Sequence, residues 1–184
     1  MISNPSNTNF VSRLKKIIDS FKNEVLKCLG VKSNAMRYFA YGSNMDLSQM
    51  QFLKVHFSQR VHAFLRGYAL RFNKIAAGRD AIAGEGKGNI IEDESAVVEG
   101  VLYDGISTAG MNILRDRERG YNEKTVTVEL ENSERLDAGT FIARDDRTRG
   151  GLKPTKKYLS HYLAAKDILS ESYMQRLRST ETLD

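Results

Sequence analysis

The chain has 184 residues, of which 41% are hydrophobic and 28% are charged, and this length and composition suit one domain with a buried core. The net charge of +5 comes mainly from residues 1–35, which hold six Lys and Arg against two acidic residues, whereas residues 36–184 hold 22 Lys and Arg against 21 Asp and Glu. Because a protein that follows nucleic-acid phosphates carries its positive charge on the domain itself, this distribution argues against a nucleic-acid partner.

The sequence lacks the marks of membrane-spanning, secreted and metal-binding proteins. It has no run of about 18 apolar residues, and its polar start, MISNPSNTNF, has no apolar signal core. Cys28 is the single cysteine and cannot form an internal disulfide, which is typical of a reducing compartment. His56, His62 and His161 are isolated and show no metal-ligand spacing. We therefore expect a cytoplasmic protein without a bound metal.

Residues 10–29 have the pattern of an amphipathic helix, because apolar side chains recur every three or four positions. Residues 6–9 offer N-cap side chains, and Gly30 offers a C-terminal stop. We expect this helix to pack on its own domain or to form a homodimer contact. The lysines on its polar face leave a second alternative, in which the helix lies on a membrane surface. The chain thus divides into an N-terminal extension, residues 1–35, and a domain, residues 36–184.

The domain alternates between segments of extended and of helical periodicity. In chain order these are a strand at 37–41, a helix at 46–55, two extended pieces at 60–76 hinged at Gly67, a strand at 96–105, a helix at 111–120, strands at 124–130 and 136–146, and helical structure over 155–177. Because the strands come in runs, we expect an α+β fold with a mixed or antiparallel sheet. The strands are short and numerous enough to close into a small barrel.

The stretch 78–88, GRDAIAGEGKG, is rich in glycine, and we expect it to be flexible. Its GKG piece resembles a phosphate-binding loop only superficially. The stretch lacks the spacing of that motif, the Ser or Thr that follows it, and a helix after it. We therefore expect no nucleotide site there.

The segment MRYFAYGSNM runs as an apolar strand into Gly42, Ser43 and Asn44. One interpretation is a plain turn, since Gly, Ser and Asn are common turn residues. The alternative is an anion site, because the free N–H groups at the start of the following helix, with those of Gly42 and Ser43, can bind a carboxylate or an oxyanion. The motif alone leaves both interpretations open.

Glu118, in LRDRERG, also allows two interpretations. It can be a solvated helix residue paired with Arg115 or Arg119. The chain has no Ser-His-Asp set, Cys-His pair or metal motif, however. If it is an enzyme, a lone carboxylate acting as general acid/base beside a backbone oxyanion site is the simplest machinery. The competing carboxylate, Glu99, lies in an apolar strand before Gly100, where we expect a structural role.

Four motifs stand in a fixed order along the domain. They are YFAYGSNM, then EGVLYD, then LRDRERGY, and finally KPTKKYL with YLAAKDILSESYMQRL. This order and spacing resemble the gamma-glutamylcyclotransferase family. The resemblance covers residues 37–178, and the ordered set of four motifs is much more specific than the Tyr-Gly-Ser-Asn motif alone.

The resemblance implies a small closed β-barrel flanked by helices, with a pocket at one end of the barrel. Glu118 falls on the catalytic glutamate of the family. The residues implied for binding the gamma-glutamyl group are Tyr41, Gly42, Ser43, Asn44 and Met45 in the loop, together with Tyr121 and Tyr158. The resemblance implies neither a cofactor nor a metal.

The implied reaction uses the α-amine of the substrate as its own nucleophile. Attack on the γ-carbonyl closes a five-membered ring and releases 5-oxoproline with a free amine or amino acid, while Glu118 serves as general acid/base. The alternative is a non-catalytic binding module that keeps the pocket for a gamma-glutamyl or carboxylate ligand.

The chain departs from the family pattern around the glutamate. The family usually has Leu-Asp and Glu-Gly there, whereas this chain has Leu114-Arg115 and Glu118-Arg119. We expect the arginines to lower the pKa of Glu118. We also expect them, with the stretch 78–95, to shape the leaving-group side of the pocket, where an acidic leaving group fits.

Overall fold

The computed structural model describes residues 35–184, and the helix predicted at 10–29 lies outside the described residues. The strands are β1 (Met36–Ala40), β2 (Gln59–Ile75), β3 (Gly86–Ile106), β4 (Tyr121–Glu129) and β5 (Arg135–Ala143). The helices are η1 (Ser43–Met45), α2 (Leu47–Phe52), α3 (Thr108–Arg117), η2 (Asp145–Arg147), α4 (Lys156–Leu163) and α5 (Glu171–Arg178). None of these described helices is long and apolar enough to cross a membrane.

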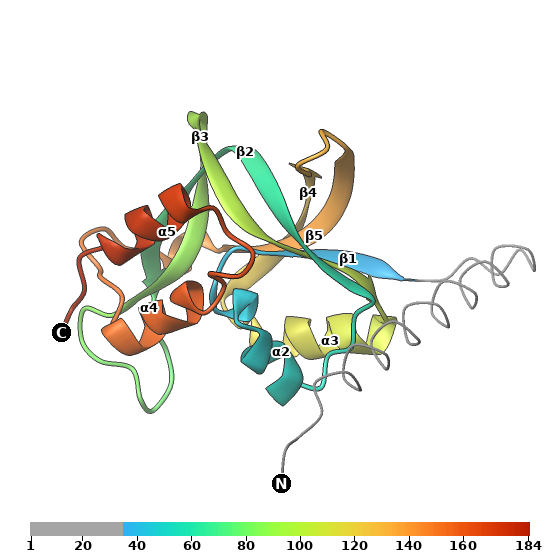
Figure 1. Cartoon of the computed structure of the whole chain (residues 1–184). Coiled ribbons are helices and arrows are strands. Elements are labelled where there is room, and N and C mark those ends of the chain that lie inside the picture. The colour runs from blue at the N-terminus through green and yellow to red at the C-terminus, as the bar shows by residue number, and fades with distance from the viewer. Residues whose placement is uncertain (1–34) are drawn as a thin grey trace, which may run out of the picture. The chain divides into compact units, whose positions relative to one another are not determined.

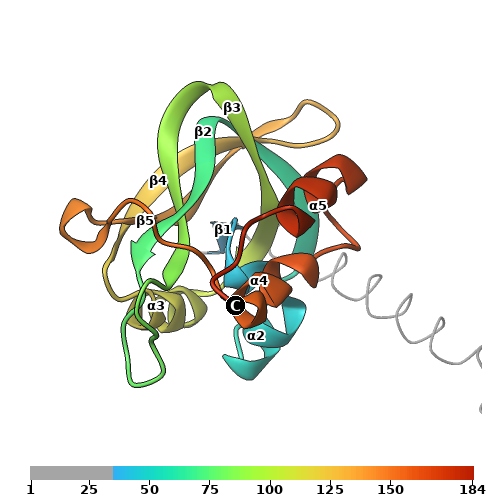
Figure 2. The ribbon, with the colours of Figure 1, turned by 90° about the vertical axis from the view of Figure 1, so that its left-hand side faces the viewer.

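The strands close into a barrel in the order β1-β3-β2-β4-β5, and Figures 1 and 2 show the helices gathered around it. β1 pairs antiparallel with β3 and closes the barrel against β5 in parallel, at Tyr38 and Gly139. β2 meets β4 at a single register pair, Phe64 and Glu129, so both contacts that close the barrel are short. The structure confirms the expected α+β fold with a small mixed barrel.

β2 and β3 are the longest strands and pair antiparallel along most of their lengths. Gly67 has a φ of +78° and lies where the register between the two strands shifts, so it bends one continuous strand. The predicted extended structure at 60–76 and the special role of Gly67 are confirmed, but the two pieces form one strand that bends at this glycine. Residues 86–88 belong to β3, so the end of the glycine-rich stretch is ordered by pairing and is not flexible.

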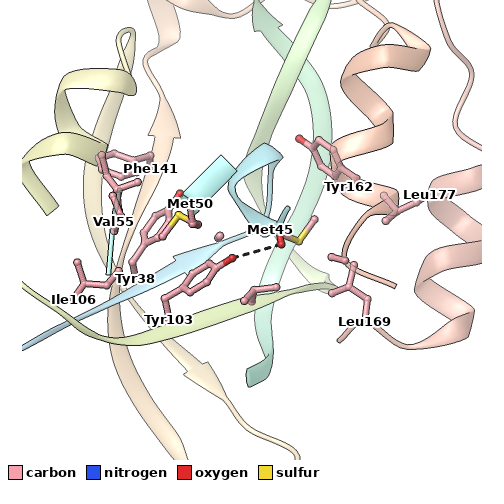
Figure 3. Close-up of a cluster of buried hydrophobic side chains, with 14 of the residues drawn as sticks. Tyr38, Met45, Met50, Val55, Tyr103, Ile106, Phe141, Tyr162, Leu169 and Leu177 are labelled. Atoms are coloured by element: carbon pink, nitrogen blue, oxygen red, sulfur yellow. Dashed lines mark hydrogen bonds between the residues drawn. The ribbon is translucent and has the colours of Figure 1, made fainter. Parts of the chain in front are cut away.

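Two groups of buried apolar side chains stabilise the fold. One comes only from the strand region, as expected of a barrel interior, and includes Phe39, Leu65, Ile90, Val98 and Val128. The other joins the barrel to the helices, and Figure 3 shows part of it, including Tyr38, Met45, Met50, Tyr103, Tyr162, Leu169 and Leu177. Within this region α4 packs against η1 and against α5, so the second group helps to hold the Gly-Ser-Asn loop in place.

Capping groups set the ends of the helices that frame this loop. Ser107 Oγ accepts a hydrogen bond of 3.2 Å from the Gly110 N–H at the start of α3, and Thr155 Oγ1 accepts one of 3.1 Å from the Tyr158 N–H at the start of α4. α3 ends at Glu118, its C-cap residue. The predicted helical stretch at 155–177 consists of two helices, α4 and α5.

Candidate active site

A small cavity of about 30 Å³ lies beside the C-terminal end of β1. Segments that are far apart in the sequence supply its lining residues, which are Tyr38, Tyr41, Gly42, Ser43, Asn44, Gly88, Glu118, Tyr121, Phe141 and Tyr158. The cavity thus unites Glu118 with each predicted binding residue except Met45. Met45 is fully buried and packs in the core, so its side chain does not line the cavity.

The Gly-Ser-Asn loop is held by hydrogen bonds to its carbonyl groups. The Tyr103 hydroxyl donates to the Asn44 carbonyl oxygen at 2.9 Å and lies 3.5 Å from that of Met45, the contact dashed in Figure 3. Arg60 Nη2 also donates to the Met45 carbonyl oxygen, at 3.1 Å. Within residues 35–184 the backbone N–H groups of Ser43 and Asn44 donate to no acceptor, which favours the anion site over the plain turn.

The Asn44 side chain links this loop to Glu118. Its Nδ2 donates to Glu118 Oε1 at 2.8 Å and to the Tyr38 hydroxyl at 3.0 Å. Its Oδ1 is buried and has no hydrogen-bond partner among the described residues. A buried carbonyl left unpaired costs about 1–3 kcal/mol, and the opposite amide orientation would point this oxygen at the carboxylate. The side-chain oxygen of Asn44, Oδ1, is therefore available to a donor group on a ligand.

Glu118 is partly buried at the end of α3, with its carboxylate in the cavity. Burial raises the pKa of this carboxyl above its ordinary value, although the hydrogen bond from Asn44 and the charges of Arg117 and Lys74 oppose the rise. A carboxylate with a raised pKa is a better proton acceptor near neutral pH. Both its position and its environment therefore suit general acid/base chemistry.

The expected net lowering of the Glu118 pKa is wrong, although the charge of Arg117 does act in that direction. Arg115 Nε donates to Glu123 at 2.7 Å, and Arg117 Nη2 donates to Gln49 at 2.9 Å. Their guanidinium groups are thus engaged on the exposed surface, where solvent screens charge. Desolvation of the Glu118 carboxylate outweighs what remains of their influence.

Gly88 is clamped between two tyrosines of the cavity. The Tyr121 hydroxyl donates to the Gly88 carbonyl oxygen at 2.7 Å, and the Gly88 N–H donates to the Tyr158 hydroxyl at 3.1 Å. Tyr158 in turn lies 3.3 Å from the Tyr162 hydroxyl. A Cβ at position 88 would lie 1.8 Å from the Tyr162 hydroxyl oxygen, so only glycine fits. The sequence predicts a flexible loop here, whereas Gly88 lies in β3 and lines the cavity.

The other cavity tyrosines are neutral hydrogen-bonding groups. The Tyr41 hydroxyl donates to the Phe141 carbonyl oxygen. Burial raises the pKa of Tyr38, Tyr41 and Tyr121 well above the ordinary tyrosine value, so these phenols stay protonated. Tyr38 is not among the predicted binding residues, although it lies in β1, the strand that leads into the Gly-Ser-Asn loop.

Two lysines lie against these aromatic rings and were also missed. Lys74 Nζ is 5.2 Å from the centre of the Tyr121 ring, and Lys87 Nζ is 4.2 Å from that of Tyr158. Burial lowers the pKa of Lys74, while the charge of Glu118 raises it. Nothing in the isolated sequence marks Lys74, because only strand pairing brings it beside the cavity.

Glu99 lies outside the cavity and holds structural elements together. Its carboxylate is 2.9 Å from His62 Nε2 and accepts hydrogen bonds from the backbone N–H and the hydroxyl of Ser170, at 2.9 and 2.7 Å. This arrangement agrees with the structural role expected for it. Among the described residues, no group of His, Cys, Asp and Glu side chains could hold a metal ion.

Comparisons with known proteins agree on one family. The model of the family described as gamma-glutamyl cyclotransferase, AIG2-like, matches residues 38–161. A solved structure titled gamma-glutamyl cyclotransferase is 21% identical, with a TM-score of 0.71, over 82% of this chain and 90% of that chain. No curated protein matches the chain by sequence.

Two further solved structures share the fold. The uncharacterized protein loc79017 from Homo sapiens is 20% identical, with a TM-score of 0.69, over 82% of this chain and 90% of that chain. YkqA from Bacillus subtilis is 25% identical, with a TM-score of 0.68, over 86% of this chain and 60% of that chain.

Proposed function

Because the chain belongs to the AIG2-like gamma-glutamyl cyclotransferase family, we propose that it releases 5-oxoproline from a small gamma-glutamyl substrate, with Glu118 as general acid/base. The observation that carries the proposal is the Glu118 carboxylate, which lies in the cavity with a raised pKa and is oriented by Asn44. Membership of the family alone does not specify the reaction, and this carboxylate is the group that can carry the proton during ring closure.

The reaction begins with transfer of a proton from the substrate α-ammonium to Glu118. The freed amine attacks the γ-carbonyl carbon and forms the new C–N bond of the ring. Glu118 then passes the proton to the leaving nitrogen as its C–N bond breaks. Over the whole reaction the attacking nitrogen loses two protons and becomes the lactam N–H, and the leaving nitrogen gains two and departs as an ammonium.

Other cavity groups match the remaining charges of the substrate. The unpaired Asn44 Oδ1 can accept a hydrogen bond from the α-ammonium beside Glu118. The N–H groups of Ser43 and Asn44 can donate to the substrate carboxylate or to the oxyanion that develops on the γ-carbonyl. Holding the flexible glutamyl chain coiled for ring closure supplies much of the rate enhancement, because pre-orientation can lower the barrier by several kcal/mol.

Entry of the substrate requires one wall of the cavity to move. A volume of about 30 Å³ corresponds to roughly one water molecule, which is less than a glutamyl group. Tyr158 separates the cavity from an open cleft of about 410 Å³ lined by residues 77–82, Lys87 and His161. Rotation of the Tyr158 ring toward that cleft joins the two spaces, and we infer that the substrate enters from there.

Release of 5-oxoproline from a panel of gamma-glutamyl amino acids, peptides and amines tests the function. The proposal predicts turnover of at least one compound without an added cofactor. No release from any compound, together with thermal stabilisation of the protein by one of them, would instead identify the binding module.

We also propose that residues 36–184 carry the activity. The matched family region lies wholly inside this range, as does every residue of the cavity. A chain that begins at Met36 should keep the kcat/KM of the full chain. A folded but inactive chain would place part of the machinery in residues 1–35.

A further inference from the structure

Two lysines stand directly opposite each other beside the cavity. Lys74 of β2 and Lys87 of β3 are register partners in the antiparallel pairing, and such partners have Cβ atoms about 5 Å apart on one face of the sheet. Like charges in this position destabilise a sheet, so their placement needs a physical reason.

The two ammonium groups flank the tyrosines that clamp Gly88. Lys74 lies over Tyr121, and Lys87 lies over Tyr158, while both tyrosines hydrogen-bond to the Gly88 backbone. The positive charge is therefore concentrated on one side of the cavity.

Lys74 is the unpaired member of the two. Lys87 forms an ion pair with Glu85, whereas in residues 35–184 no carboxylate lies within ion-pair distance of Lys74, which is only 7% exposed. Its Cε passes 3.4 Å from the position of a Cβ on Gly120, two residues after Glu118. A buried ammonium with no carboxylate in contact is costly, and attraction to Glu118 offsets only part of that cost, because burial still lowers the pKa of Lys74. The site therefore holds a positive charge close to Glu118 with which a ligand carboxylate can pair.

We propose that Lys74, with Lys87 opposite it, binds the α-carboxylate of the leaving amino acid, so that the enzyme prefers gamma-glutamyl amino acids to gamma-glutamyl amines. This inference rests on the proposed function. In a gamma-glutamyl amino acid the carboxylate carbon is two bonds from the nitrogen that Glu118 protonates, so the carboxylate lies within a few ångströms of Glu118. The glutamyl group itself occupies the opposite wall, which Ser43 and Asn44 form.

Two substrates that differ only in the carboxylate test the preference, namely gamma-glutamyl-alanine and gamma-glutamyl-ethylamine. Lys74→Met should lower kcat/KM for the alanine compound about tenfold to a hundredfold more than for the ethylamine compound, as expected for the loss of a charged hydrogen bond. Lys74→Arg keeps the charge and should retain most of the preference. Lys124→Met is the matched control, because Lys124 lies 5.6 Å from the centre of the Tyr68 ring, and Tyr68, unlike Tyr121 and Tyr158, does not line the cavity.

The outcomes separate this inference from the proposed function. An equal fall for both substrates in Lys74→Met would mean that Lys74 acts only through the pKa of Glu118, and would overturn the inference while leaving the function intact. Release of 5-oxoproline from neither substrate by the unaltered protein, with turnover of another compound of the panel, would overturn the inference alone, whereas release from no compound of the panel would overturn both. If Lys74→Met does not fold, Lys87→Met gives the same comparison, and an unchanged substrate ratio in that variant would overturn the inference.

Discussion

Substitution of Gly88 by alanine should destabilise the protein by an amount that the structure allows us to work out. The new Cβ would lie 1.8 Å from the Tyr162 hydroxyl oxygen and 3.1 Å from its Cζ. Tyr162 is fully buried and cannot turn into solvent, so the backbone of β3 or α4 must shift. Such overpacking costs about 1–3 kcal/mol, and loss of the hydrogen bond between Gly88 and Tyr158 costs about 1 kcal/mol more.

The expected loss in the free energy of unfolding is therefore about 2–4 kcal/mol, or about 5–15 °C in Tm for a domain of this size. A double-mutant cycle with Tyr162→Phe, followed by urea denaturation, tests the cause. The phenylalanine removes the clashing hydroxyl but leaves the contact at Cζ, so the double variant should recover about 1 kcal/mol or more relative to additivity. Wild-type stability of Gly88→Ala, or strict additivity in the cycle, would refute the reasoning.

Three further predictions concern Glu118 and its supports. Because the pKa of Glu118 is raised in the folded state, the ionised carboxylate destabilises the fold at any pH above the pKa that Glu118 has in the unfolded chain. Glu118→Gln should therefore raise Tm at pH 7.5 but not at pH 4. An equal gain in Tm at both pH values would contradict this. Asn44→Leu removes a group that lowers this pKa, so the acid limb of the profile of kcat/KM against pH should move to higher pH; an unmoved limb argues against the assignment. Tyr103→Phe deletes the donor to the backbone carbonyl of Asn44. It should lower the free energy of unfolding by about 0.5–1.5 kcal/mol and should also lower kcat/KM. The control Tyr68→Phe, which lies outside the cavity, should leave kcat/KM unchanged.

Local patterns predicted most elements of the fold. The apolar run before Gly42, the alternation in β4 and the spacing in α3 each depend on neighbouring residues, which a single sequence displays. The length of β2 and β3 could not be read in this way. Gly67 and the glycines of 78–88 look like breaks, and only the pairing of the two strands makes them parts of one long hairpin.

Local patterns likewise predict only some of the residues of the candidate site. Glu118 and the loop at 41–44 carry a recognisable motif, and the structure brings them together. The predicted direction of the Glu118 pKa is wrong chiefly because the sequence does not reveal that the carboxylate is buried; nor does it reveal that the neighbouring Arg115 pairs with Glu123. Lys74 and Gly88 reach the site through strand register alone, so no local pattern could mark them.

The central claim is that Glu118 moves the proton during ring closure. The most direct measurement is kcat for 5-oxoproline release by the unaltered protein and by Glu118→Gln, on the best gamma-glutamyl substrate at pH 7.5. Glutamine keeps the shape of the side chain and can still accept the hydrogen bond from Asn44, but it cannot accept the substrate proton. We predict a fall in kcat of about a hundredfold or more in a folded protein. Equal kcat values for the two proteins would contradict the assignment of Glu118 as the acid/base.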